Sequence, residues 1–426
     1  MNLPSIRAET EARLARIASE DPSLRAFIRV DAEDALSSAS AADDRRVGGQ
    51  TLSPLDGVTV AIKDNLAMAG KPWTAGIRGR RGLFAGADAD AVARLRAAGA
   101  ILIGGANMEE AALGAVTDNP TFGRCINPLG PGLTPGGSSG GSAATVAAGF
   151  VDLALGTDTM GSVRVPAAYC GIAGIKPTYG AISQDGLAML CPSLDTIGPI
   201  ARDVELLWPA LKIMATTEAR DRWLEPVGSD ELSGVTFGVP KQLRTVDCEE
   251  AIDAGLLQAV EAVKSLGGTV AEIDLEGWDP QRSRRAGLLV TEAEGARELA
   301  SLMDEPDAIS DHLRSLLIYG RDAPAEKLAT AHATIAAAAQ AVDQAFVDVD
   351  AILLPTAPQR AFPHGRTPPS NQADLTALAN FGGCPAVALP VGLAGETLSG
   401  SIQIIGPRWS DPAVLAWAGA LAPQLT

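Results

Sequence analysis

Histidine is scarce in this sequence, which limits the general bases available to the chain. The 426 residues contain three histidines, His312, His332 and His364. His312 and His332 lie in helical patterns, and we interpret both as surface or structural residues. His364 lies in the proline-rich stretch "AFPHGRTPP", so a Ser-His-Asp mechanism would depend on this residue alone.

Cysteine is also infrequent, which argues against a disulfide framework or a zinc site. No two of the five cysteines have the spacing of a CxxC or zinc motif; they are Cys125, Cys170, Cys191, Cys248 and Cys384. An odd number of separated thiols is typical of a reducing compartment. We therefore expect a cytoplasmic protein without a metal or an organic cofactor.

Basic clusters and long apolar runs are missing as well. The chain has 34 Lys and Arg against 51 Asp and Glu, a net charge of −17, and such a chain repels phosphate groups. The most apolar long run, "AATVAAGFVDLALG", is too short to span a bilayer, and the charged N-terminus lacks the apolar core of a signal peptide. We expect no nucleic-acid or membrane partner, and we leave the assembly open between a monomer and a homodimer.

Strand-like and helical patterns alternate along most of the chain. Strand patterns occupy 58–62, 100–105, 151–156, 235–240, 269–275, 351–355, 385–392 and 400–406, and helical patterns occupy 89–99, 141–150, 249–266, 284–348 and the end after Asp411. This alternation predicts an α/β fold with a mixed, mostly parallel, twisted sheet covered by helices on both faces. We expect one large domain over 1–426, with a core of about 50–205 and 345–426 and a helical accessory or substrate region of about 205–345.

Two glycine- and serine-rich segments, "TPGGSSGGSAA" (134–144) and "GTDTMGSVRVP" (156–166), contain the candidate nucleophiles. The "GGSSG" part matches the G-x-S-x-G elbow of α/β-hydrolases, but no apolar strand pattern precedes it. A phosphate-binding loop is excluded because no lysine follows at the required place. A serine nucleophile needs a neighbouring base, and the motif alone does not identify one.

Lysine is the other candidate base, and Lys63 is the most unusual lysine. It ends the apolar strand pattern "GVTVAIKDN", where alternation places it on one face with Thr59 and Ala61. Burial there would lower its pKa and leave a free amine. The strand pattern alone leaves a second option open, in which the lysine lies just beyond the sheet and points into water.

The sequence resembles the amidase signature family in several ordered motifs. They cover nearly the whole chain: "LDGVTVAIKDN", "AVARLRAAGAILIGGANMEE", "GRCINP", "TPGGSSGGSAATVAAG", "LALGTDTMGSVRVPAAYCGIAGIKPTYG", "SLDTIGPIARD", "VDAILLPTAP" and "GCPAVALPVG". The resemblance implies the α/β fold of this family and its Ser-cisSer-Lys triad. By this resemblance Ser162 is the nucleophile, Ser138 relays its proton from a cis peptide bond after Gly137, and Lys63 is the base.

The resemblance also implies roles for residues around the triad. Backbone N–H groups of Thr159, Met160, Gly161 and Ser162 occupy the positions of the family's oxyanion hole. Ser139 is implied to be a supporting hydrogen bonder, and Asp158 and Arg164 to brace the turn.

Other positions near these motifs are structural or line the pocket. Asp195 is interpreted as structural, and Ala111 and Ala112 fall where relatives line the acyl pocket. Relatives often have glycine at the position of Met160, so this side chain either narrows the pocket or points away from it.

The expected function is hydrolysis of the C–N bond of a small, linear carboxylic amide to a carboxylate and ammonia. The alternative is the glutaminase-type A subunit of a tRNA-dependent amidotransferase, or a component of another multi-subunit amidase complex. The chain is shorter than we expect for that A subunit, and we expect it to have no additional tail for docking partners. The amide itself stays open; Arg285, Arg314 and Arg321 could hold a substrate carboxylate, although we favour surface positions for them.

Overall fold

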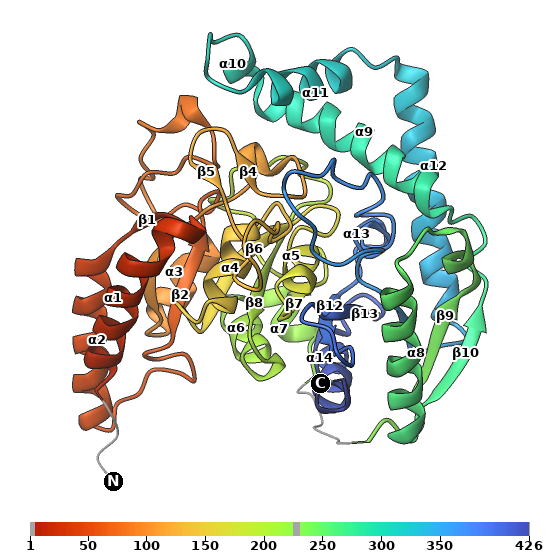
Figure 1. Cartoon of the computed structure of the whole chain (residues 1–426), viewed down its shortest axis with the longest axis horizontal. Coiled ribbons are helices and arrows are strands. Elements are labelled where there is room, and N and C mark those ends of the chain that lie inside the picture. The colour runs from red at the N-terminus through yellow and green to blue at the C-terminus, as the bar shows by residue number, and fades with distance from the viewer. Residues whose placement is uncertain (1–4, 225–230, 426) are drawn as a thin grey trace.

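The centre of the molecule is an eleven-stranded sheet. A computed structural model describes residues 5–224 and 231–425 (Figure 1). The strand order is β1-β3-β2-β6-β8-β7-β12-β13-β11-β9-β10. The strands are β1 (Phe27–Val30), β2 (Thr59–Lys63), β3 (Ile101–Ala106), β6 (Leu153–Asp158), β7 (Ala173–Lys176), β8 (Thr196–Ala201), β9 (Thr236–Pro240), β10 (Thr269–Ile273), β11 (Ala351–Pro355), β12 (Ala386–Val391) and β13 (Gly400–Ile405). A separate short hairpin joins β4 (Asp118–Asn119) to β5 (Gly123–Arg124).

The sheet is mixed. Strand β2 lies between β3 and β6 and is parallel to both, and β9 is parallel to β10 and β11. The remaining neighbours pair antiparallel. All eight strand patterns of the sequence form strands of this sheet, whereas β1, β7 and β8 were not predicted. Strands β1 and β7 have only four residues each, and β8 is interrupted at its centre by the adjacent Gly198 and Pro199.

Helices cover both faces of the sheet, as predicted. The helices are α1 (Ile6–Leu24), α2 (Ala32–Val47), α3 (Asp90–Ala97), α4 (Gly140–Ala147), α5 (Arg164–Tyr169), α6 (Leu207–Met214), α7 (Thr217–Arg222), α8 (Glu250–Ser265), α9 (Pro280–Glu298), α10 (Ala300–Met303), α11 (Asp311–Arg321), α12 (Ala325–Ala345), α13 (Ala377–Phe381) and α14 (Asp411–Leu421). Val60 and Ile62 of β2 pack in one apolar cluster with α3, α6, α8 and α14. Ala61 packs in another cluster with α1, α2, α4 and α5. The single large α/β domain with a mixed, helix-covered sheet is therefore confirmed.

A layer of helices from the stretch predicted to be helical lies over one end of the sheet (Figure 1, upper right). Helix α9 begins at Pro280, where the Asp279 side chain accepts a hydrogen bond from Arg282 N, and it packs along α11 and α12. The crossing with α11 needs Gly320, because a Cβ there would lie 2.3 Å from the Glu292 carbonyl carbon. No helix within residues 5–224 and 231–425 combines the length and apolar character needed to cross a bilayer.

Candidate active site

The amine of Lys63 is completely buried at the end of strand β2. Its Nζ donates to Ser138 Oγ (2.7 Å) and to Thr157 Oγ1 (2.7 Å). Burial lowers the pKa of Lys63 to about 7, although the carboxylates of Asp195 and Asp158 act in the opposite direction. The structure thus places this lysine inside the protein and not in water.

Ser138 lies on the glycine-rich loop that precedes α4. The Gly137–Ser138 peptide bond is cis, as the resemblance implied. The loop packs so closely on its neighbours that a Cβ at Gly140 would lie 2.3 Å from Thr117 Oγ1. Ser139 binds the adjacent strand twice, since its Oγ accepts from Thr157 N (3.2 Å) and donates to Thr157 O (3.2 Å).

Ser162 lies on the turn between β6 and α5 and is partly exposed, whereas Ser138 is buried. The Ser139 N–H donates to Ser162 O (3.3 Å), which joins this turn to the glycine-rich loop. In the described part of the chain, the Ser138 and Ser162 hydroxyls are not hydrogen-bonded to each other. The fold therefore brings Lys63 and Ser138 into direct contact and sets Ser162 on the adjoining turn.

The turn with Ser162 is organised by Asp158, whose carboxylate is buried. Asp158 Oδ1 accepts from Gly161 N (2.7 Å) and Asn380 Nδ2 (2.9 Å), and Oδ2 accepts from Val163 N (3.1 Å). Arg164, also buried, binds both carboxylate oxygens at 2.9 and 3.0 Å. Burial alone would raise the pKa of Asp158, but the Arg164 guanidinium holds it at about 2.

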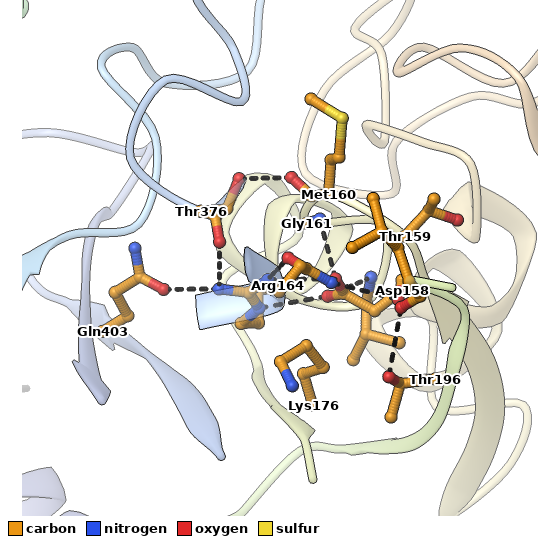
Figure 2. A network of polar contacts seen from close by, with 12 residues as sticks. Asp158, Thr159, Met160, Gly161, Arg164, Lys176, Thr196, Thr376 and Gln403 are labelled. Atoms are coloured by element: carbon orange, nitrogen blue, oxygen red, sulfur yellow. Dashed lines mark hydrogen bonds and ion pairs between the residues drawn. The ribbon is translucent and has the colours of Figure 1, made fainter. Parts of the chain in front are cut away.

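Arg164 also ties this turn to the C-terminal part of the chain (Figure 2). It donates to Thr376 O (2.9 Å), Gln403 Oε1 (2.7 Å) and Asn380 Oδ1 (2.7 Å). Thr376 Oγ1 in turn donates to Met160 O (2.7 Å). The sequence analysis missed Thr376, Asn380 and Gln403. The available signal was the presence of polar residues in mostly apolar runs, Thr376 and Asn380 in "LTALANF" and Gln403 in "SIQII".

The backbone N–H groups of the turn differ in whether they have a hydrogen-bond acceptor within the protein. The Gly161 N–H is used by Asp158, and this glycine has φ +128° with Thr376 Oγ1 only 2.3 Å from where a Cβ would lie. No hydrogen bond is recorded between the N–H of Thr159, Met160 or Ser162 and any atom of the described residues. The residues that carry these three N–H groups all line the pocket described next.

A pocket that is partly open to solvent contains Ser162 in its wall. It is lined by Ala112, Leu113, Gly114, Ala115, Gly137, Thr159, Met160, Gly161, Ser162, Val165, Leu190, Leu288, Thr291, Gln372 and Ala373. Met160 narrows the pocket, because its Sδ reaches α9 and lies 3.9 Å from Thr291 Oγ1. Ala112 lies in the wall as implied, whereas Ala111 is not among these residues.

The remaining sequence candidates lie away from this pocket. Arg285, Arg314 and Arg321 are not in its wall, and Arg321 pairs with Asp322 at the surface. Asp195 supports the turn that carries Ser162, because its Oδ1 accepts a hydrogen bond from Thr159 Oγ1 (2.5 Å).

The three histidines also lie outside the pocket wall. His312 and His332 are exposed, and the His364 ring Nε2 lies 2.8 Å from Cys125 O. Across 5–224 and 231–425 no group of three or more His, Cys, Asp or Glu side chains could hold a metal ion.

Known proteins resemble this chain over nearly its full length. The family described as Amidase matches residues 8–415. The A subunit of the glutamyl-tRNA(Gln) amidotransferase of Chloroflexus aurantiacus is 34% identical, over 98% of this chain and 92% of that protein. Among solved structures, one described as an amidase is 31% identical with a TM-score of 0.89, covering 99% of this chain and 97% of its own. The corresponding amidotransferase chain from Thermotoga maritima is 28% identical with a TM-score of 0.80, covering 96% and 90%.

The buried Asp158–Arg164 pair leads to a prediction about stability. Arg164→Ala leaves the Asp158 carboxylate buried without its cation, so we expect the free energy of unfolding in urea at pH 7 to fall by about 3–5 kcal/mol. Because the folded pKa of Asp158 is depressed, its contribution is present above about pH 4 and disappears as the pH falls toward 2. The control is Arg244→Ala, which removes an exposed ion pair with Glu272 and should cost less than about 1 kcal/mol. Equal losses in the two variants would contradict the assignment.

Proposed function

Since the chain belongs to the amidase signature family, we propose that it hydrolyses the C–N bond of a carboxylic amide to a carboxylate and ammonia. The observation that carries this proposal is the 2.7 Å contact between Lys63 Nζ and Ser138 Oγ, beside a pocket that contains Ser162. A neutral amine at this distance can accept the Ser138 proton, and Ser138 can then accept one from a neighbouring hydroxyl.

In the acylation step Ser162 Oγ forms a bond to the carbonyl carbon of the amide. Its proton moves to Ser138 as the Ser138 proton moves to Lys63. When the C–N bond breaks, the same path returns the proton to the departing nitrogen, which leaves as ammonia. Water then attacks the ester on Ser162, gives its proton to the same path, and releases the carboxylate while Ser162 recovers its proton.

The negative oxygen that forms during each attack needs hydrogen-bond donors held in place beforehand. The unpaired N–H groups of Thr159, Met160 and Ser162 support this role, and each such donor typically contributes a factor of about 10²–10³ in kcat. The Gly161 N–H is occupied by Asp158, so we assign Gly161 and Asp158 to holding the shape of the turn. Ser139 and Arg164 act similarly, by joining this turn to its neighbours.

A second candidate is the glutaminase-type component of a multi-subunit amidotransferase. Curated relatives at 32–35% identity include A subunits of glutamyl-tRNA(Gln) amidotransferases, and they favour this candidate over a stand-alone amidase. The chemistry at Ser162 would be the same in both cases. The candidates differ in the amide that is bound and in whether a partner protein receives the ammonia.

The nucleophile is tested by Ser162→Ala. We expect ammonia release from a hydrolysed amide to fall by roughly 10⁴–10⁶-fold without loss of folding, because the hydroxyl is the attacking atom and contributes little to packing. Ser19→Ala, the same change on the exposed face of α1, is the matched control and should keep full activity. Substantial activity in Ser162→Ala together with an inactive Ser138→Ala would reverse the two assignments.

The base is tested by the pH dependence of kcat/KM. If Lys63 acts as a free amine, the rate should rise through an apparent pKa of about 7 and level off above it, because the protonated amine cannot accept a proton. Lys63→Arg should be inactive over the same range, since a guanidinium stays protonated.

A histidine titrates in a similar range, so the matched control is His364→Gln, which should keep the rising limb. Loss of this limb in His364→Gln, or an active Lys63→Arg enzyme with an unchanged profile, would contradict the lysine base.

A further inference from the structure

Gln372 is an unusual member of the pocket wall, because it is a polar side chain that is 93% buried in a mostly apolar surface. Its exposed fraction is 7%, and it shares the pocket with Ser162. It lies on the segment that leads into α13, far in sequence from the nucleophile. Its position raises the question of what its amide group binds.

A chain of two hydrogen bonds behind the pocket orients this amide. Gln359 Nε2 donates to Tyr169 Oη (2.6 Å), and Tyr169 Oη donates its single proton to Gln372 Oε1 (3.2 Å). Tyr169 is itself buried, so the chain is held in place by packing. The oxygen of Gln372 is therefore turned toward Tyr169. Its Nε2 has no recorded partner among the described residues.

The rest of the wall is mostly apolar and carries no charge; its other polar side chains are the hydroxyls of Thr159, Ser162 and Thr291. Leu113, Leu190, Leu288 and Met160 are among its larger apolar side chains, and no charged side chain is present among the described residues that line the pocket. Asp374 follows the wall residue Ala373 in the sequence, and it forms an ion pair with Arg284. The two side chains are 11% (Arg284) and 6% (Asp374) exposed, and their charges neutralise each other. A charged substrate group that packs against this apolar wall would lose water without gaining a counter-charge.

We propose that Gln372 is a specificity-determining residue, whose Nε2 donates a hydrogen bond to an acceptor oxygen in the acyl part of an uncharged and otherwise apolar amide. This inference rests on the proposed amide hydrolysis and adds the class of substrate. It separates the two candidate functions, because glutamine carries an ammonium and a carboxylate for which the pocket offers no partner.

The experiment compares isosteric amides that differ in one oxygen. The probes are hexanamide, its ether analogues 4-methoxybutanamide and 3-ethoxypropanamide, and glutamine, with ammonia release as the readout. We expect at least one ether to exceed hexanamide by about 10-fold in kcat/KM, because an N–H group that is covered by a methylene and gains no acceptor loses a hydrogen bond to water without replacement. Glutamine should lie at least about 100-fold below that ether.

Gln372→Met keeps the size of the side chain and removes its N–H group. We expect the ether-to-hexanamide ratio of kcat/KM to fall to about 1, through a higher KM for the ether and not through kcat. Gln242→Met, the same change at a residue that binds Asp274 near the surface, is the matched control and should leave the ratio unchanged.

Each other outcome overturns the inference. A preference for glutamine, or an unchanged ratio in Gln372→Met, would refute the proposed substrate class and leave amide hydrolysis standing. Failure to hydrolyse any of the neutral amides would also refute it. Labelling of Ser162 by a fluorophosphonate would then show whether the proposed function fails as well, since an active nucleophile reacts with this probe and an inactive one does not.

Discussion

The removal of the Lys63 amine from water governs the arrangement of the site. Strand β2 carries this residue between two parallel strands, and the glycine-rich loop covers its end, so that Nζ contacts two hydroxyl groups. Lowering the pKa from 10.5 to about 7 costs on the order of 5 kcal/mol of folding free energy at pH 7. Because the folded protein binds this proton less tightly than the unfolded chain, the cost is complete below pH 7 and disappears as the pH rises toward 10.5. The same burial that destabilises the fold leaves a large fraction of the Lys63 amine unprotonated near neutral pH.

Strand β6 connects the proposed base to the proposed nucleophile through two consecutive residues. Thr157 contacts Lys63, and Asp158 holds the turn that carries Ser162. Arg164 extends this arrangement to the C-terminal segment, from which Gln372 reaches the same pocket. A change in the packing of the C-terminal segment would therefore alter both the shape of the turn and the substrate that fits.

Much of this arrangement could be predicted, and the missing parts have physical reasons. Alternation along β2 correctly placed Ala61 on the face opposite Val60 and Ile62, because it depends only on the period of a strand. Burial of the amine did not follow from the pattern, since the loop that covers it comes 75 residues later. Likewise, Thr376, Asn380 and Gln403 join Asp158 and Arg164 only through long-range packing. The side chain of Met160 lines the pocket because α9, over a hundred residues away, supplies the opposing surface.

The protonation state of Lys63 is the central claim, and it can be measured directly. The chain has seven lysines, so ¹³Cε-lysine labelling gives a simple NMR spectrum whose chemical shifts can be followed against pH. Lys63→Met identifies the resonance and separates it from that of Lys176, whose burial lowers its pKa to about 8. The account predicts that the Lys63 resonance titrates near pH 7, well below the exposed lysines. A Lys63 resonance that titrates together with them, near about pH 10.4, would contradict the account.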